Sequence, residues 1–223
     1  MVKVNRTAEP QSLVQNAVAW RNELLNQIQV NGTFSAVPDR YKNLYNQADV
    51  KAALETMYGE KCCYCEGIIG ECSYGNIEHL KPKSRFHDLT FAWGNLHWCC
   101  PVCNNKKRDK WNSADPILDP TVDDPDDHLE FDLVNCKIRP KNSSRAQTTI
   151  EHAKLNRPEL VVKRKRLKTR ILRILMQAES STSQQDRDFY RQELLRLAVN
   201  DPANGDIAEH SLFVRALLAQ SGL

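Results

Sequence analysis

The chain has 223 residues, of which 41% are apolar and 26% are charged, so it can enclose a hydrophobic core and has the composition of a globular protein. No apolar run approaches the roughly 18 residues that a membrane span requires. The N-terminal sequence MVKVNRTAEP is polar and lacks the apolar segment of a secretory signal. We therefore expect a cytoplasmic protein that does not span a membrane.

The net charge of +3 conceals a strong segregation of charge along the chain. Residues 112–135 contain eight acidic side chains and no Lys or Arg, whereas residues 137–173 contain thirteen Lys or Arg against two Glu, a balance of +11. A basic surface of this kind can bind nucleic acid. A solvated helix face beside an acidic loop accounts for the same pattern, so charge alone leaves both interpretations open.

The N-terminal region, residues 1–60, is predicted to be helical. Apolar side chains recur at helical spacing over residues 8–29 and again over residues 39–57. The stretch between them contains Gly and Pro and is expected to be a loop. Gly59 can end the second helix.

The composition changes over residues 61–111, which are rich in Cys, Gly, His, Asn and Trp and contain no long periodic segment. Ile68, Ile69 and Ile77 flank a turn-like stretch that contains Gly75, which predicts a short hairpin over residues 66–80. A short helix is expected over residues 101–110, because proline suits the first helical turn.

The remainder divides into two predicted regions. Residues 112–140 begin as a Pro- and Asp-rich loop and end in a stretch, HLEFDLVNCKIRP, that alternates apolar and polar residues as a β-hairpin does. Residues 141–223 form a predicted C-terminal helical region. Its helices are expected over residues 157–178, 184–198 and 207–220.

Seven of the eight cysteines fall between residues 62 and 103, and clustered cysteines in a cytoplasmic chain of this length indicate metal binding rather than disulfides. The two-residue gap of a CxxC knuckle occurs in Cys62/Cys65 and again in Cys100/Cys103. Four soft thiolates at this spacing predict one shared structural zinc ion. Buried, reduced core cysteines are the alternative interpretation.

The four remaining cysteines are not expected to bind this ion. Cys63 and Cys99 adjoin the predicted ligands but do not give the two-residue gap. Cys72 and Cys136 have no such partner either, and we assign both of them to the core.

The order of residues between and around the knuckles resembles the HNH endonuclease superfamily. That family combines two CxxC knuckles with an acidic residue and a histidine before an apolar residue and proline, an internal Asn-Leu, and a final His or Asn. The matching residues are EHLKP at 78–82, Asn95-Leu96 and Asn104. The resemblance implies an α+β fold, mostly α-helical, with a zinc-stapled ββα-metal finger embedded between N-terminal helices and a C-terminal helical region.

Phosphodiester hydrolysis needs a base for the attacking water and a cation for the charge on the leaving oxygen. A neutral imidazole can take a proton near pH 7, so His79 is the predicted general base. Glu78 and Asn104 offer oxygen ligands to a hard ion, Mg²⁺ or Mn²⁺, with Asn105 as the fallback. Asn95 matches the family's internal asparagine, whose amide can fix the loop that carries the histidine; an ordinary turn cap is the alternative.

Basic side chains surround the motif. We predict that they contact nucleic-acid phosphates, although solvated charge would give the same pattern. The residues are Lys81, Lys83, Lys106, Lys107 and Arg108.

The whole layout is also similar to the HNH subunit of Septu-type anti-phage systems, which some retron systems share. The segments KCCYCE, IEHLKPKS and NLHWCCPVCNNKK carry this resemblance, together with the helices at both ends. It implies a DNA endonuclease of bacterial defence that works with an ABC-type ATPase partner. An HNH-type nuclease acting on RNA such as tRNA, and a non-catalytic zinc-bound adaptor, are the alternatives.

Overall fold

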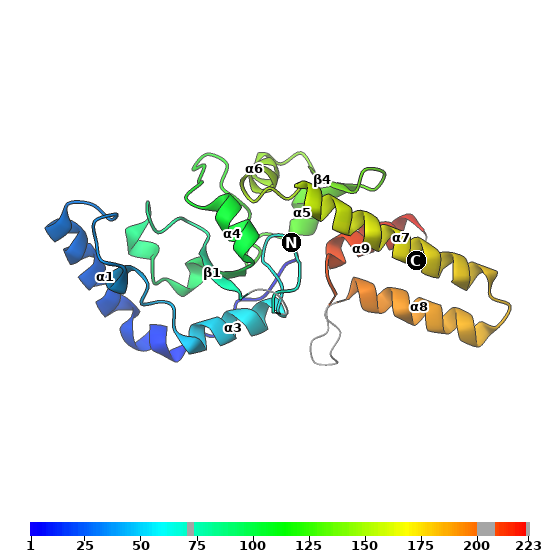
Figure 1. The fold of residues 1–223 in the computed structure, drawn as a ribbon, viewed down its shortest axis with the longest axis horizontal. Helices are drawn as coiled ribbons and strands as arrows, with labels where there is room; N and C mark the ends of the chain where they lie inside the picture. Colours follow the sequence, from blue (N-terminus) through cyan, green and yellow to red (C-terminus); the bar gives the residue numbers. More distant parts are fainter. Residues whose placement is uncertain (71–73, 200–207, 222–223) are drawn as a thin grey trace.

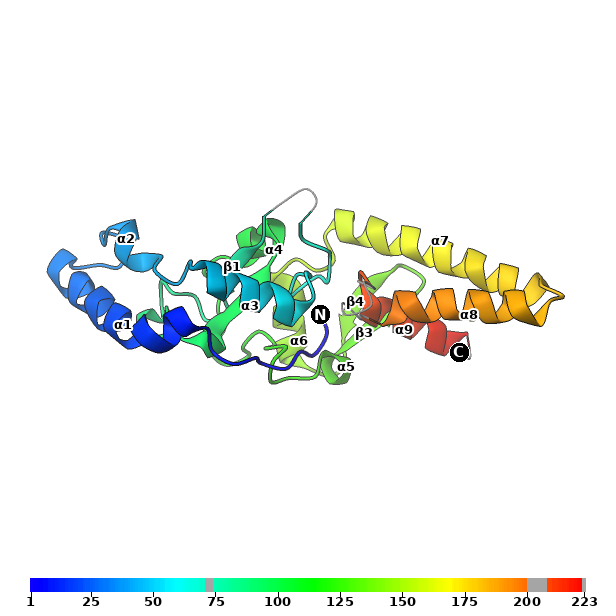
Figure 2. The ribbon, with the colours of Figure 1, turned by 90° about the horizontal axis from the view of Figure 1, so that it is seen from below.

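The computed structural model of the chain describes residues 1–70, 74–199 and 208–221. Helices flank a small two-stranded finger in the middle of an elongated molecule. Helix α1 (Gln11–Asn31) lies at one end, and the paired helices α7 (Pro158–Ser180) and α8 (Gln184–Ala198) lie at the other (Figures 1 and 2). The predicted α+β class with mostly helical content is confirmed.

The predicted helix over residues 39–57 is wrong in one respect, because it is two helices, α2 (Asp39–Lys42) and α3 (Ala48–Tyr58). The chain leaves the helical conformation at Asn43, and the break brings the ring of Tyr45 against that of His79. Gly59 ends α3 in the left-handed region, at φ 54°, where a residue without Cβ is favoured.

The finger consists of strands β1 (Asn76–His79) and β2 (Leu96–Cys99), followed by helix α4 (Pro101–Lys107). The strands are antiparallel, with Asn76 opposite Cys99. The predicted hairpin over residues 66–80 is therefore wrong, since the partner of β1 comes from beyond a loop that contains two short 3₁₀ turns. The predicted order of two strands and a helix is present.

Gly75 serves close packing in the structure. A Cβ atom placed on this residue would lie 2.0 Å from the ring of Trp98, which is far inside the contact distance of two carbons. The glycine therefore lets the indole of β2 pack directly against the backbone that enters β1.

The C-terminal half begins with α5 (Pro125–His128) and the predicted hairpin, which is confirmed as β3 (Leu129–Asp132) and β4 (Lys137–Pro140). Helix α6 (Ser144–His152) follows. The three predicted C-terminal helices are present as α7, α8 and α9 (Ser211–Gln220), although residue 207, where the last was expected to begin, lies outside the described residues.

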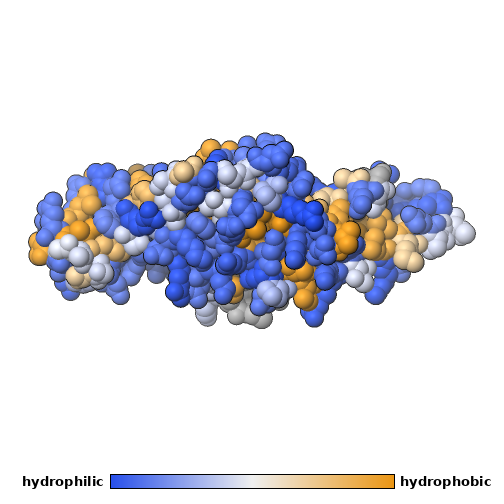
Figure 3. All heavy atoms as spheres, turned by 90° about the horizontal axis from the view of Figure 1, so that it is seen from above, coloured by the Kyte–Doolittle hydropathy of each residue, from blue (hydrophilic) through white to orange (hydrophobic). Residues whose placement is uncertain are grey.

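The main hydrophobic core surrounds the finger and joins it to both flanking regions, from Leu13 of α1 to Leu160 of α7. A second cluster fills the space between α7, α8 and α9 and contains Cys136, which is buried as predicted; Cys72 lies outside the described residues. The face shown in Figure 3 is mostly hydrophilic, with apolar patches toward both ends. Within the described ranges, no helix combines the length and apolar character needed to cross a membrane.

Candidate functional site

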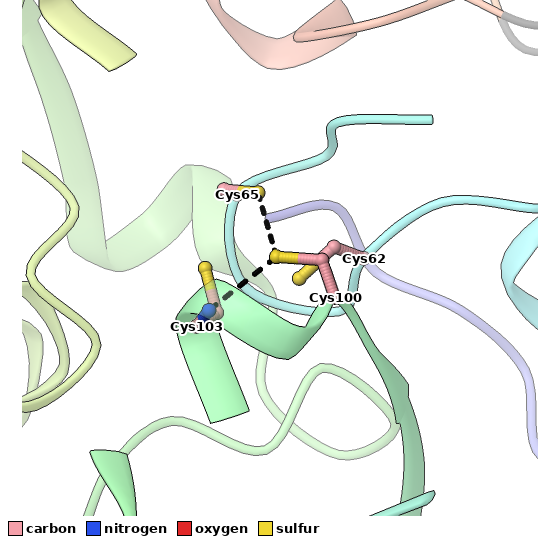
Figure 4. A group of neighbouring side chains, drawn as sticks. All are labelled: Cys62, Cys65, Cys100 and Cys103. Carbon is pink, nitrogen blue, oxygen red and sulfur yellow. Dashed lines mark hydrogen bonds between the residues drawn. The ribbon is translucent and has the colours of Figure 1, made fainter. Parts of the chain in front are cut away.

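The two CxxC knuckles meet at a single point. Cys62 and Cys65 come from the loop before β1, Cys100 directly precedes α4, and Cys103 lies in the first turn of that helix (Figure 4). All four Sγ atoms lie within 4.8 Å of one another, and those of Cys65 and Cys100 are 4.0 Å apart. Tetrahedral zinc with bonds of about 2.3 Å places its sulfurs roughly 3.8 Å apart. The cluster therefore fits a tetrahedral thiolate site.

A second group of thiols overlaps the first. Cys62 also lies within 4.8 Å of Cys63 and Cys99. Three sulfurs leave a tetrahedral ion one ligand short, whereas the two CxxC knuckles complete its shell. The guanidinium of Arg157 donates to the Sγ of Cys103 at 3.3 Å, and this positive charge favours the thiolate form that a metal needs.

A separate cleft of about 360 Å³ brings together the residues predicted for hydrolysis. Glu78 and His79 of β1 line it from one side and Asn104 of α4 from the other, while none of the four clustered cysteines lines it. Asn105, the fallback ligand, does not line the cleft, and its side chain accepts a hydrogen bond from Arg108 instead. Glu78 and Asn104 thus offer oxygens at one place, apart from the cysteine cluster.

The ring of His79 is buried and held in one orientation. Its Nε2 lies 2.9 Å from the carbonyl oxygen of Thr90, and because a carbonyl only accepts, Nε2 donates and the neutral ring keeps its lone pair on Nδ1. The ring of Tyr45 packs edge-on at 4.6 Å between centroids. Burial, and then the positive charge of Lys83, lower the pKa of His79 to about 3, so the ring is neutral at pH 7 with the Nδ1 lone pair unprotonated.

Glu78 is tied to helix α4 by a buried ion pair. Its Oε1 lies 2.5 Å from the Nζ of Lys107 and accepts from the hydroxyl of Tyr64 at 3.3 Å. The other oxygen, Oε2, has no hydrogen-bond partner in the described part of the chain. Burial outweighs the attraction of Lys107 and raises the pKa of Glu78 to about 7, so a cation at the free oxygen would favour the charged form.

Lys107 is placed differently from a surface phosphate contact. Its side chain is fully buried, and its Nζ also donates to the backbone oxygen of His79 at 2.6 Å. One ammonium group therefore joins the end of β1 to the last turn of α4. In this arrangement Lys107 supports Glu78 and His79 from behind the cleft.

Two of the other predicted phosphate contacts, Lys83 and Arg108, line the cleft. Lys81 lies on a neighbouring surface, 5.9 Å from the ring centroids of Phe86 and Trp111. Lys106 is exposed on the other side of α4 and lines a different hollow. The structure thus brings only part of the predicted basic set to the candidate site.

Asn95 is buried and does not line the cleft. Its Oδ1 accepts from the backbone nitrogen of Lys81 at 2.8 Å, and its Nδ2 donates to the backbone oxygens of Lys81 and Leu89 at 3.0 and 3.2 Å. These are the hydrogen bonds expected of an amide that fixes the loop after His79. The geometry favours a positioning role for this residue.

We expect Asn95→Ala to lower the free energy of unfolding by about 2–3 kcal/mol, because it leaves buried backbone groups without partners. Urea denaturation monitored by circular dichroism measures this loss. The matched control is Asn104→Ala, whose side chain makes no hydrogen bond to a described residue and which should change stability by less than about 0.5 kcal/mol. Equal stability of the two variants would contradict a positioning role for Asn95.

Two tyrosines of the site could not be recognised from the sequence. Tyr45 contacts His79 and accepts a hydrogen bond from Lys83 Nζ at 2.8 Å, but helical periodicity marked it only as an inward residue of a longer helix. Tyr64 lies between two of the cysteines and donates to Glu78. The buried position of Lys107 could have been predicted, since this residue follows Cys103 by four positions and so shares its inward helix face.

Comparison with known proteins identifies relatives that are named as Septu proteins and as a retron protein. The chain is 29% identical over 163 residues to a Septu protein PtuB of Bacillus thuringiensis and 29% identical over 196 residues to one of Bacillus mycoides strain KBAB4. It is 28% identical over 171 residues to a protein of retron Vc95, named as a candidate HNH endonuclease, from Vibrio cholerae serotype O1 biovar El Tor. No protein-family model matches the chain.

These alignments cover most of the present chain but less of the Septu proteins. They include 73%, 74% and 69% of this chain and 57%, 66% and 80% of the respective relatives, so the chain spans less than two thirds of the two Septu sequences. One of the three relatives is thus named for HNH endonuclease chemistry and two are named as Septu proteins. The chain is a homologue of the Septu PtuB proteins and of the retron protein, as its layout predicted.

Proposed function

We propose that this chain is a metal-dependent HNH endonuclease that hydrolyses DNA phosphodiester bonds. The cleft between β1 and α4 carries the proposal, because the ring of His79, the carboxyl group of Glu78 and the amide of Asn104 line it together. The homology to a candidate HNH endonuclease supports the same class of chemistry.

In the proposed reaction, Nδ1 of His79 takes the proton from the attacking water, while the hydrogen bond to the carbonyl of Thr90 holds the ring and its tautomer. Glu78 Oε2 and Asn104 would hold Mg²⁺ or Mn²⁺, which supplies positive charge to the leaving oxygen. Lys83 and Arg108 line the same cleft and can contact the flanking phosphates.

The four-cysteine cluster has a separate, structural role in this proposal. Cys62, Cys65, Cys100 and Cys103 would hold zinc, because four thiolates fill a tetrahedral shell and leave no open position for substrate. The ion would fix the loop before β1 to the start of α4. It would thereby set the position of the helix that carries Asn104.

We further propose that the nuclease is the effector of a bacterial anti-phage system and works with an ABC-type ATPase partner. The homology to Septu proteins and to a retron protein supports the cellular role. The resemblance of the sequence layout to the Septu HNH subunit is the basis for the ATPase.

The central test is cleavage of plasmid DNA in Mg²⁺ or Mn²⁺ by the wild type and by His79→Ala. We expect the variant to lose at least about a hundredfold in rate, since it lacks the general base. His152→Ala is the matched control, because this histidine lies on α6 and does not line the cleft, and it should cleave like the wild type.

A second pair of variants tests the metal. Asn104→Ala should need more Mg²⁺ for half-maximal cleavage, whereas Asn105→Ala should not, because only Asn104 lines the cleft. Equal cleavage by the wild type and His79→Ala would contradict the proposal. So would an absence of DNA cleavage even with the cognate ATPase added, and tRNA assayed in parallel would show whether the substrate is RNA.

A further inference from the structure

A stripe of basic side chains follows one face of α7. Lys163, Arg166, Arg170 and Arg173 recur at intervals of three, four and three residues, so they share a helix face. All four are exposed, while Ile171 on the adjoining face is buried against the second core cluster. Ten residues of helix rise about 15 Å, a length that spans roughly four base pairs along the axis of a DNA duplex.

Three cations of the stripe, Arg166, Arg170 and Arg173, have no charged partner among the described residues, and two of these line a cleft. A cleft of about 630 Å³ between α7 and α8 is lined by Lys163, Arg166 and Arg170, and also by two carboxylates. One of these, Glu209, pairs with Lys163 at 3.4 Å. The other, Glu193, pairs with Arg196 at 3.0 Å.

Arg166 and Arg170 form no ion pair or hydrogen bond with any residue in the ranges that the structure describes. Because they stand four residues apart, their like charges destabilise each other. An anion bound between them would remove this repulsion.

The stripe also continues onto helix α4, which carries one wall residue of the candidate nuclease cleft. A second hollow, of about 510 Å³, shares Lys163 with the first and is lined as well by Arg157 and by Lys106 of α4. Lys106 lies two residues from Asn104, which lines the nuclease cleft. In both ribbon views α4 lies between β1 and the start of α7 (Figures 1 and 2). Basic side chains therefore continue from α7 onto the side of α4 that faces away from the cleft.

We propose that this face of α7 binds the phosphate backbone of the DNA duplex to one side of the scissile bond, with Arg166 and Arg170 as its principal contacts. The proposal rests on the nuclease function proposed above and adds the position of the flanking duplex. Contacts between guanidinium groups and phosphates hold the duplex without reading its sequence. The periodic spacing and the continuation of basic side chains onto the helix that carries Asn104 favour DNA over an acidic protein surface.

The test measures binding without cleavage. Every protein carries His79→Ala and the divalent ion is omitted, and the fluorescence anisotropy of a labelled DNA duplex is recorded over a range of salt concentrations. Arg166→Gln/Arg170→Gln should weaken binding by about tenfold to a hundredfold and should reduce the slope of log affinity against log salt by about 2, since two phosphate contacts are lost. Circular dichroism checks that the exposed substitutions leave the fold intact.

A matched control removes the same charge elsewhere. Arg21→Gln/Lys165→Gln takes one exposed cation from α1 and one from another face of α7, and it should keep most of the affinity and the salt slope. Equal weakening in both double variants would overturn the proposal, because it would show only a general charge effect. Unchanged binding in Arg166→Gln/Arg170→Gln would overturn it too and would point to a protein partner for this face.

The outcome is separable from the nuclease proposal. If the protein with His79 intact cleaves DNA while Arg166→Gln/Arg170→Gln binds normally, only the α7 surface is wrong. If the double variant loses affinity and salt slope while no cleavage occurs, the surface stands and the nuclease assignment fails.

Discussion

Cys100→Ser is expected to release the zinc ion and to unfold the finger. Structural zinc contributes apparent binding energies of about 10–16 kcal/mol to isolated zinc fingers at neutral pH. Here the finger also packs into the main core, so part of the fold should persist while the loop before β1 and helix α4 lose their mutual position. Zinc stoichiometry by mass spectrometry under native conditions, with the melting temperature, measures both effects.

The overlapping thiols allow a sharper control for the zinc prediction. Cys99→Ala removes a buried sulfur that belongs to the three-thiol group with Cys62 and Cys63 but lies outside the four-cysteine cluster. It should keep its zinc, as should Cys136→Ala in the second core. Loss of zinc from Cys99→Ala, together with its retention in Cys100→Ser, would show that the three-thiol group binds the ion instead of the four-cysteine cluster. That result would contradict the prediction.

Lys107→Met should lower the free energy of unfolding by about 3–5 kcal/mol, because it leaves the carboxyl group of Glu78 buried without its partner. The variant also removes the hydrogen bond to the backbone oxygen of His79. Urea denaturation at saturating zinc measures the effect. The neighbouring Lys106→Met is the matched control, since that side chain is exposed and its replacement should change stability by less than about 0.5 kcal/mol.

A double-mutant cycle isolates the pair itself. Adding Glu78→Gln to Lys107→Met removes the unpaired carboxyl group and should restore part of the lost stability, so the two substitutions should be less costly together than their sum. Strict additivity would show that the pair at 2.5 Å contributes nothing specific. A Lys107→Met variant as stable as Lys106→Met would contradict the buried placement of Lys107.

The spacing of nearby residues in the sequence predicted those parts of the fold that depend on local contacts. The CxxC gaps predicted the four-cysteine cluster because each pair spans a single tight turn, and Pro101 predicted the start of α4. Helical periodicity likewise predicted α7 and α8 closely. Gly59 could be recognised because the end of a helix often requires a left-handed residue.

The features that the sequence did not reveal depend on contacts between distant segments. Nothing near β1 indicates that its partner is β2, because the two strands are far apart in the sequence and meet through contacts such as that of Trp98 with Gly75. The sequence Lys106-Lys107 shows two identical charges, yet helix phase exposes the first and buries the second. Tyr45 reaches His79 only because the helix breaks before it.

Helix α4 joins the two proposed ion sites within less than two turns. Cys103 belongs to the thiolate cluster, the adjacent Asn104 lines the hydrolytic cleft, and Lys107 holds Glu78 on the opposite wall. Two ions that stabilise the same placement of one rigid element bind cooperatively, and the coupling is reciprocal. We therefore expect zinc occupancy to raise the affinity for the hydrolytic ion. A chain without zinc should bind that ion weakly, whether or not substrate is present.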